Sequence, residues 1–323
     1  MELKPDLKPI IIPIAAGKGG VGKTFLAANL AIAFAELKKK TIVLDLDLGG
    51  SNLYSWLNAR NIHPGIGDFL FSGKKPLEEF IVKDLREYLS YIPGDGQSAG
   101  LANIKHLQKQ KIIRAISSLE ADFILLDLSA GTTFNTLDFF NLSNNGLIVT
   151  IPEMTSVMNV LGFFKNFLLR AMSKEFAKNV DAMEILNSFR KRSIGKESIR
   201  FSELIKKIEE LDSGAGAKAR EICKYYAPRI VFNMGISRDN LSFGKRLKEI
   251  LNEYLMLDIE FIGFIYWNSD VIKSVYNGTR FLEQFPDSPA TVSIKKIADR
   301  LIKYGNSRIE NSFEKLYNSV NEK

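Results

Sequence analysis

A glycine-rich segment between two apolar runs constrains the fold of this chain more than any other feature. Residues 17–24 read GKGGVGKT, which fits the pattern G-x-x-x-x-G-K-[ST]. The apolar run 10–15 precedes this segment, and an alanine-rich run over residues 25–37 follows it. A strand, a glycine-rich turn and a helix in that order are typical of a phosphate-binding loop. We therefore expect a phosphorylated ligand to bind here.

Different residues of this loop have different expected roles. The backbone N–H groups would surround phosphate oxygens, and the helix that begins near Lys23 would add the positive end of its dipole. The Lys23 ammonium would reach the β- and γ-phosphates, and the Thr24 hydroxyl would contact Mg²⁺. The residues expected to contact the nucleotide in this loop are Gly17, Lys18, Gly19, Gly20, Val21, Gly22, Lys23 and Thr24.

Acidic residues end two further strand-like runs. Residues 41–45 and 123–127 are apolar runs that end in aspartate, a pattern typical of buried parallel strands. Ligands of open α/β sheets bind beyond the carboxyl ends of the strands, so Asp45, Asp47 and Asp127 are expected near the phosphates. Asp127 fits the Walker B pattern and would hold the Mg²⁺ shell.

The spacing of Asp45 and Asp47 allows two interpretations. Carboxylates two residues apart fall on the same side of an extended chain, so one could assist Mg²⁺ while the other orients the attacking water. An Asp-x-Asp sequence is also typical of turns. Both interpretations stay open at this point.

Strand-like and helix-like segments alternate through most of the chain. Further strands are expected at residues 88–92, 147–151, 229–233 and 261–265, and helices at 67–71, 76–81, 103–119 and 291–304. The chain has 323 residues, of which 46% are apolar, so it can form a large core. We predict a single α/β domain over residues 1–323, with a three-layer, doubly wound and mostly parallel sheet.

Residues 163–228 depart from this alternation, because they are mostly helical in pattern and polar. Between Lys165 and Arg229 there are fifteen basic and nine acidic residues, a net charge of +6 out of +7 for the whole chain. We predict a basic helical insertion on the α/β core. A localised basic segment can bind nucleic acid or an anionic membrane, and a solvated helical face is the alternative.

The chain is expected to end in helices over residues 291–323. Within residues 307–323, the apolar residues Ile309, Phe313, Leu316, Tyr317 and Val320 share one helical face. Such a face could anchor a peripheral protein to a membrane. The opposite face carries no clear excess of positive charge, which favours a helix that packs on the core or on a partner.

Other features indicate the compartment. Residues 1–9 are charged and lack the apolar core of a signal peptide, and no apolar run is long enough to span a membrane. Cys223 is the only cysteine, which excludes a disulfide framework within the chain and a Cys-x-x-Cys metal site. We expect a cytoplasmic protein, and the tail leaves open a peripheral position at the inner membrane.

The second lysine of the loop is more specific than the Walker A pattern. KGGVGKT at residues 18–24 resembles the deviant Walker A box of the MinD/ParA ATPases. The resemblance implies an ATP-dependent homodimer in which Lys18 reaches across to the phosphates of the partner subunit. Residues 45–52 resemble switch I of this family. That likeness implies that Asp47 positions or activates the water, and that Asn52 contacts phosphate and water.

Later segments extend the resemblance over nearly the whole chain. Residues 127–131 resemble switch II of the family, and residues 152–157 resemble the stretch that follows the next strand in MinD. Asn233 matches the position that contacts adenine. Residues 266–268 read YWN where the family usually has Pro-x-Asp, which leaves the selectivity for the base open. The runs 45–52 and 131–140 are most similar to the MinD-like ATPases FlhG, FleN and YlxH, which set flagellar number and placement.

The resemblance implies a Mg²⁺-dependent ATP hydrolase that is slow without a stimulating protein partner. The implied catalytic residues are Lys18, Lys23 and Asp47, and the implied metal site comprises Thr24, Asp47 and Asp127. The expected function is an ATP-driven dimerisation switch in spatial positioning within the cell, either of flagellar number and placement or in regulation like that of cell division. One alternative is a ParA-type partitioning ATPase that binds non-specific DNA. Another is a metal- or cluster-delivery ATPase, which needs paired cysteines across the dimer.

Overall fold

The computed structural model describes residues 8–94, 104–191 and 200–320. Four features considered above lie at least partly outside these ranges: the charged first residues, the start of the predicted 103–119 helix, part of the basic segment, and the last three residues. Within the described ranges, no helix combines the length and the hydrophobicity that a bilayer-spanning helix needs.

The strands of the described residues form one eight-stranded sheet in the order β3-β4-β2-β5-β1-β6-β7-β8. Their bounds are β1 (Ile10–Ala15), β2 (Thr41–Leu46), β3 (Val82–Arg86), β4 (Leu89–Ile92), β5 (Phe123–Leu128), β6 (Leu147–Thr150), β7 (Arg229–Gly235) and β8 (Glu260–Tyr266). All neighbouring pairs are parallel except β3 and β4. The strands β2 and β5 are buried at every position, as expected of parallel strands covered on both faces.

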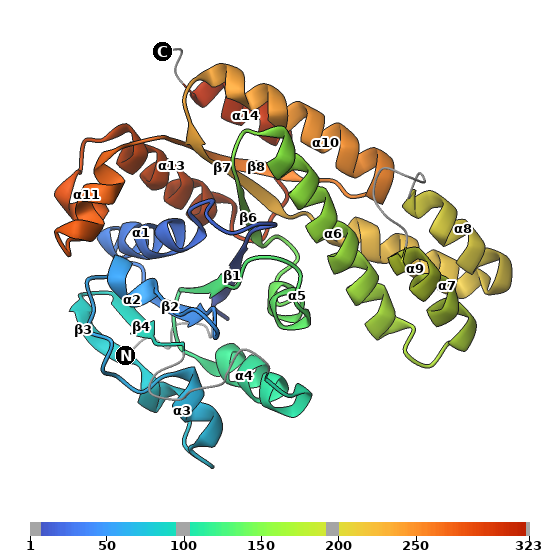
Figure 1. The fold of residues 1–323 in the computed structure, drawn as a ribbon, viewed down its shortest axis with the longest axis horizontal. Helices are drawn as coiled ribbons and strands as arrows, with labels where there is room; N and C mark the ends of the chain where they lie inside the picture. The colour runs from blue at the N-terminus through green and yellow to red at the C-terminus, as the bar shows by residue number, and fades with distance from the viewer. Residues whose placement is uncertain (1–7, 95–103, 192–199, 321–323) are drawn as a thin grey trace, which may run out of the picture.

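Helices cover both faces of this sheet (Figure 1). Alternate residues of β5 face opposite layers, since Leu125 packs in one apolar cluster and Ile124 and Leu126 pack in the other. One face is covered by α1 (Lys23–Glu36), α2 (Leu53–Trp56), α12 (Phe281–Gln284) and α13 (Pro289–Tyr304), and α11 (Asp270–Tyr276) adjoins α12. The other is covered by α3 (Ile66–Phe71), η1 (Leu77–Phe80), α4 (His106–Ser118), α5 (Phe134–Phe140), α6 (Met154–Glu175) and α10 (Ser242–Leu255). The predicted three-layer, doubly wound fold is confirmed.

The strand order brings the acidic strand ends together. Asp45 on β2 lies opposite Asp127 on β5, and Asp127 lies opposite Ile14 on β1 in the other direction. The loop after β1 therefore begins beside the carboxylate that ends β5. The antiparallel strand β3 was not predicted, because its sequence VKDLR has too few apolar residues to show a buried strand.

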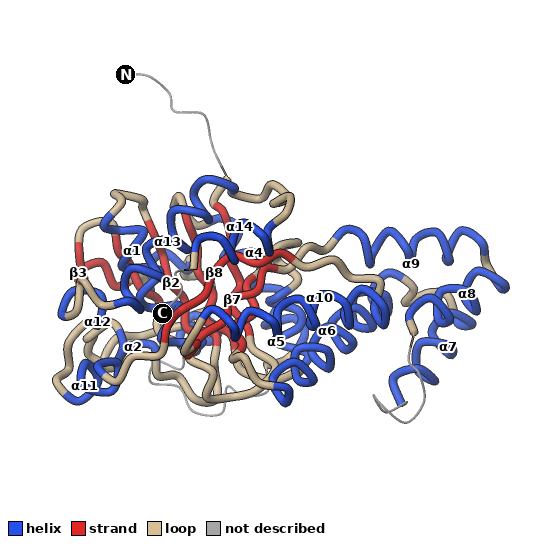
Figure 2. The backbone as a smooth tube through the Cα atoms, turned by 90° about the horizontal axis from the view of Figure 1, so that it is seen from above, coloured by secondary structure: helices blue, strands red, loops and turns tan. Residues whose placement is uncertain are grey.

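The predicted insertion corresponds in part to an arm of three helices that projects from the sheet (Figure 2). Residue 163 lies within α6, which begins at Met154 and packs on α5, α10 and β6. The helical arm comprises α7 (Val180–Lys191), α8 (Phe201–Leu211) and α9 (Ser213–Tyr225). These helices bury their own apolar residues, including Leu186, Phe189 and Leu204, against the main core.

Part of the basic excess in residues 165–229 is balanced by carboxylates that lie outside this segment. Lys165 is buried on α6, and Arg229 is buried in an ion pair with Glu260, with 3.0 Å between Nε and Oε2. On the described part of the segment, ion pairs join Arg170 and Lys174 to Asp138, Arg200 to Glu253, Lys206 to Glu210, Lys218 to Glu221, and Arg220 to Glu209. The charge count therefore overstates the positive charge that is free to attract DNA.

The apolar face of the C-terminal segment is buried on the protein. The helix α14 (Ser312–Ser319) packs on β8, and Leu316 and Val320 are buried in the core. Arg229 donates hydrogen bonds to the backbone oxygens of Gly305 and Ser307, and so fixes the approach to α14. Ile309, Leu316 and Val320 are buried whereas Tyr317 is 38% exposed, so most of this apolar face packs on the protein.

Asp138 on α5 joins three elements through ion pairs. Its carboxylate is buried and contacts Lys109 on α4, and it accepts hydrogen bonds at 2.9 Å from Nε and Nη2 of Arg170 on α6. Lys174 Nζ lies 2.7 Å from Oδ1. Burial acts to raise the pKa of Asp138, but the hydrogen bonds from these three cations outweigh it and hold the pKa well below its usual range.

Asp138→Asn should therefore destabilise the protein in a pH-dependent way. We expect a loss of about 3 kcal/mol at neutral pH, at the lower end of the range for a broken buried pair because two of the cations are partly exposed. Since the folded pKa is depressed, the contribution is complete above the unfolded pKa of about 3.9 and declines as the pH falls from there through the folded pKa. Urea unfolding at pH 7, 4 and 2.5 measures this, and an equal difference at all three values contradicts it.

Candidate functional site

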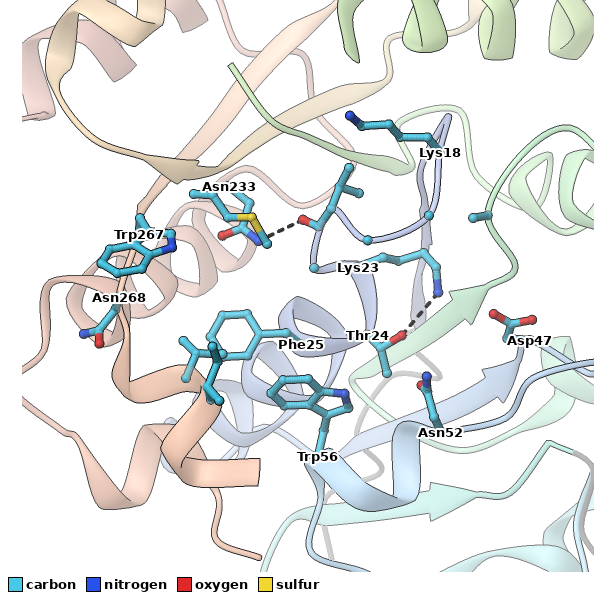
Figure 3. Close-up of a pocket in the computed structure, with 18 of the residues that line it drawn as sticks. Lys18, Lys23, Thr24, Phe25, Asp47, Asn52, Trp56, Asn233, Trp267 and Asn268 are labelled. Atoms are coloured by element: carbon cyan, nitrogen blue, oxygen red, sulfur yellow. Dashed lines mark hydrogen bonds between the residues drawn. The ribbon is translucent and has the colours of Figure 1, made fainter. Parts of the chain in front are cut away.

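The loop between β1 and α1 borders a cavity of about 430 Å³ at the carboxyl ends of the strands (Figure 3). Most residues predicted for the site line this cavity: Lys18, Gly19, Gly20, Val21, Gly22, Lys23, Thr24, Asp47, Asn52 and Asn233. Gly17 and Asp127 lie just behind the lining. The fold thus brings together side chains that are up to about two hundred residues apart in sequence.

Two glycines of the loop cannot be replaced without displacing other groups. Gly22 has a φ of 85°, a backbone conformation that residues with a side chain rarely adopt. A Cβ at this position would lie 2.2 Å from Nδ2 of Asn233. A Cβ on Gly17 would lie 2.5 Å from the backbone oxygen of Asn159 on α6. The loop is therefore held close to both β7 and α6, with its curvature set by the glycines.

Lys23 and Asp127 form a buried ion pair at the base of the cavity. Lys23 Nζ donates to Oδ1 of Asp127 at 2.5 Å, and the two side chains are 8% and 0% exposed. Burial raises the pKa of Asp127, and the Lys23 ammonium opposes this shift. The other oxygen, Oδ2, is buried and has no hydrogen-bond partner among the described residues. An unpaired buried carboxylate oxygen has capacity for a further ligand.

The two carboxylates at the carboxyl end of β2, Asp45 within the strand and Asp47 just after it, have different surroundings. Asp45 is fully buried, and its Oδ2 accepts hydrogen bonds from the Ser51 hydroxyl at 2.6 Å and from N–H groups of Asn52 and Leu53 at 3.1 Å. Burial, together with the charge of Asp127, raises the pKa of Asp45 to about 7. The turn interpretation therefore holds for Asp45, which closes the turn before α2 and does not line the cavity.

Asp47 is the carboxylate that faces the cavity. Its Oδ1 accepts a hydrogen bond from the Ser129 hydroxyl at 2.9 Å. Ser129 follows β5 directly, and the next loop residues approach the phosphate-binding loop, since Gly131 N donates to the backbone oxygen of Ala16 at 3.0 Å. We did not predict a role for Ser129, although its position two residues after Asp127 could have indicated one.

Lys18 extends away from Lys23 at the rim of the cavity (Figure 3). Its side chain is 33% exposed, and its Nζ lies 3.4 Å from Oε2 of Glu153, which is 58% exposed. Glu153 directly precedes α6. The ammonium is thus at the surface, where a second molecule can reach it.

The end of the cavity remote from Lys23 is formed by β7, β8 and aromatic side chains. Asn233 is buried on β7, and its Nδ2 donates to the backbone oxygen of Val21 at 2.9 Å. This contact fixes the orientation of the amide and leaves the carbonyl oxygen without a hydrogen-bond partner among the described residues. Residues 266–268, which the resemblance places beside the base, and Ala130 of the stretch 127–131 also line the cavity, and the lining residues that we did not predict are Phe25, Trp56, Met234, Val271 and Ile272. Those after β8 follow from the strand-end rule, but Phe25 and Trp56 give no signal in the sequence.

Known proteins are similar to this chain in sequence. Residues 12–281 match the family model of the CobQ/CobB/MinD/ParA nucleotide binding domain. An uncharacterized ATP-binding protein of Methanocaldococcus jannaschii is 25% identical over 296 residues, which cover 92% of this chain and 89% of that protein. The septum site-determining protein MinD of Escherichia coli strain K12 is 30% identical over 171 residues, which cover 51% of this chain and 62% of MinD. The last match thus spans less than two thirds of that relative.

A solved structure agrees with the fold. The septum site-determining protein MinD of Pyrococcus horikoshii, complexed with Mg-ADP, superimposes with a TM-score of 0.58. The sequences are 19% identical, and the match covers 93% of this chain and 99% of that one. At this identity the likeness concerns the fold.

Proposed function

The chain belongs to the CobQ/CobB/MinD/ParA nucleotide-binding family, and from this membership we propose that it is an ATP-dependent, dimerising ATPase of the MinD/ParA type. The observation that carries the proposal is the Lys23–Asp127 pair, at 2.5 Å, beneath a glycine-rich loop that leads into α1. The Mg-ADP bound to the P. horikoshii protein supports ATP and Mg²⁺ as the ligands.

The residues at the end of β5 suit a hydrated Mg²⁺. Oδ2 of Asp127 is buried without a partner, and the Thr24 hydroxyl and the Asp47 carboxylate line the adjoining cavity. Oxygen ligands of this kind are those that Mg²⁺ prefers. When bound, Mg²⁺ would neutralise negative charge on the β- and γ-phosphates.

The side chains around the cavity divide the work of hydrolysis. Lys23 would exchange its contact with Asp127 for the phosphates and stabilise charge on the transferring group. Asp47, held by the Ser129 hydroxyl, would orient the attacking water. Asn52 would contact the phosphate and the water.

Dimerisation would complete the site. Lys18 is at the rim, points away from Lys23 and has only an exposed partner in Glu153. In a dimer that faces two cavities toward each other, each Lys18 would stabilise the phosphates bound to the other subunit. Hydrolysis would then release the loop after β5 and separate the subunits.

Asp47→Ala should separate hydrolysis from dimerisation. We expect the variant to bind ATP and to dimerise with it, while phosphate release falls about 100-fold or more because the water loses its orienting group. Light scattering with ATP and with ADP measures the dimer, and a phosphate-release assay measures turnover. Asp258→Ala is the matched control, since Asp258 is partly exposed and precedes β8 at the opposite edge of the sheet. Absence of an ATP-dependent dimer in both the natural protein and the variant would contradict the proposed function.

The cellular role belongs to the same proposal. We favour spatial positioning, with flagellar number and placement as in the FlhG-type ATPases, and a stimulating protein partner in the cytoplasm or at the inner membrane. Capture of partners from native lysate on the Asp47→Ala dimer tests this, and recovery of chromosomal partners alone would contradict it.

Two alternatives have less support. The ParA-type alternative rests on the basic segment, whose described cations are largely paired or buried. It predicts ATP-dependent, salt-sensitive binding to non-specific DNA. The cluster-delivery alternative requires an accessible thiol, whereas Cys223 on α9 is buried and burial raises its pKa to about 12.

A further inference from the structure

Trp267 is an exposed aromatic residue that lines the cavity. Trp267 is 60% exposed. Among the described residues, its indole ring takes part in none of the aromatic ring pairs. Ligand cavities are lined mostly by apolar and aromatic side chains, so a large ring in the lining is available to a bound ligand. The position of Trp267 in the lining, and not its exposure alone, is the reason to consider it.

The backbone that carries this ring is fixed although the ring is not packed. Trp267 N donates to the backbone oxygen of Gly235 at 2.8 Å, which ties the loop after β8 to the end of β7. The next residue, Asn268, accepts a hydrogen bond from Asp270 N at 2.7 Å through its side-chain oxygen, at the start of α11. The indole is therefore presented from a defined position, which lowers the entropy cost of binding against it.

The rest of this end of the cavity is also aromatic. Phe25 and Trp56 pack edge to face with 5.4 Å between ring centroids, and Phe25 packs on Phe281 at 5.3 Å. Figure 3 shows Trp267 beside Asn233, on the side of the cavity away from Lys23 and Thr24, with Phe25 and Trp56 below. The cavity thus has one cationic end and one aromatic end. A nucleoside polyphosphate has the same division between charged phosphates and a flat, apolar base.

We propose that Trp267 is the stacking platform for the base of the bound nucleotide. This inference rests on the proposed function. Trp267 stands at the variable middle position of residues 266–268, which read YWN where the family usually has Pro-x-Asp. Stacking depends on the flat face of a base and not on its hydrogen-bonding edge. Trp267 would therefore supply affinity for adenine and guanine alike, while the free carbonyl oxygen of Asn233 supplies the preference for the amino group of adenine.

The chain offers a direct optical test, because Trp56 and Trp267 are its only tryptophans. Trp56→Phe leaves Trp267 as the single reporter. In that variant we expect Mg-ADP and Mg-GDP to quench the fluorescence, and Mg-pyrophosphate to leave it unchanged, because only the nucleotides carry a base. Quenching by pyrophosphate to the same extent, or no quenching by ADP that binds, would overturn the stacking assignment.

Affinity measurements complete the test. In the otherwise natural protein, Trp267→Ala should lower the affinities for ADP and for GDP by similar factors of about 5- to 100-fold. The affinity for pyrophosphate should stay unchanged. Trp267→Phe should retain most of the affinity. Tyr276→Ala, which removes an 87% exposed ring on α11 outside the cavity lining, is the matched control and should change none of the three affinities. Undiminished ADP affinity in Trp267→Ala overturns this inference alone, whereas failure of the natural protein to bind ADP and pyrophosphate overturns the proposed function with it.

Discussion

Lys23→Ala should destabilise the nucleotide-free protein by about 3–5 kcal/mol and also abolish ATP hydrolysis. The stability loss follows from Asp127, which is fully buried and would lose the ammonium that lies 2.5 Å from its Oδ1. Asp45 lies opposite Asp127 in the sheet and is buried as well, so this neighbour adds a second carboxylate and cannot replace the charge of Lys23. Urea unfolding without nucleotide measures the first effect, and phosphate release measures the second.

A double variant separates these two effects. Lys23→Ala combined with Asp127→Asn removes the uncompensated charge, so most of the lost stability should return while hydrolysis stays absent. If the double variant is as unstable as Lys23→Ala alone, the instability comes from lost packing around the Lys23 stem and the ion-pair explanation is wrong. Recovered stability in the double variant would instead show that Lys23 balances a buried carboxylate before the nucleotide binds and holds phosphate afterwards.

The sequence predicted the strands and the loop of the site because their signals are local. A glycine-rich turn between a strand and a helix, and apolar runs that end in aspartate, each depend on neighbouring residues only. The different functions of Asp45 and Asp47 could not be predicted in this way. Both lie at the carboxyl end of the same strand, and the turn that brings Ser51 and Leu53 back onto Asp45 distinguishes them.

The basic segment shows a second limit of local reasoning. The count over residues 165–229 gives a net charge of +6, but several of the neutralising carboxylates lie outside that window. Asp138 pairs with Arg170 and Lys174, Glu253 pairs with Arg200, and Glu260 pairs with Arg229. A sequence window cannot contain partners that only the fold brings near, so the surface charge was overestimated.

The aromatic end of the cavity was predicted only through the resemblance of residues 266–268, and its composition was missed for a related reason. Trp56 and Trp267 are more than two hundred residues apart, and neither belongs to a phosphate-binding motif. Their common location follows from α2 lying after β2 and from the loop after β8 reaching the same sheet edge. Residues that bind a base by shape and stacking have no fixed spacing in the sequence. Residues of a continuous loop that contacts phosphate do have such a spacing, and so they form a recognisable motif.

Lys18→Ala should abolish ATP-dependent dimerisation while the protein still binds nucleotide. The fold should be unaffected, because the ion pair with Glu153 at 3.4 Å is exposed and such pairs contribute about 0–1 kcal/mol. The dimer should weaken by about 2–5 kcal/mol, the loss found when one partner of a desolvated charge pair at an interface is removed. Gel filtration of the variant with ATP should then show a monomer, and an ATP titration should show retained binding.

Lys273→Ala is the matched control for this test. Lys273 is a more exposed lysine on α11, next to the same cavity, and its ion pair with Asp270 is also at the surface. Its loss should leave the ATP-dependent dimer intact, because it neither belongs to the loop nor lines the cavity. An intact dimer in Lys18→Ala would mean that Lys18 does not reach the second subunit, and the site would then be complete within one chain. Loss of the dimer in both variants would instead indicate a general effect of surface charge, and only loss confined to Lys18→Ala supports a lysine that acts across the interface.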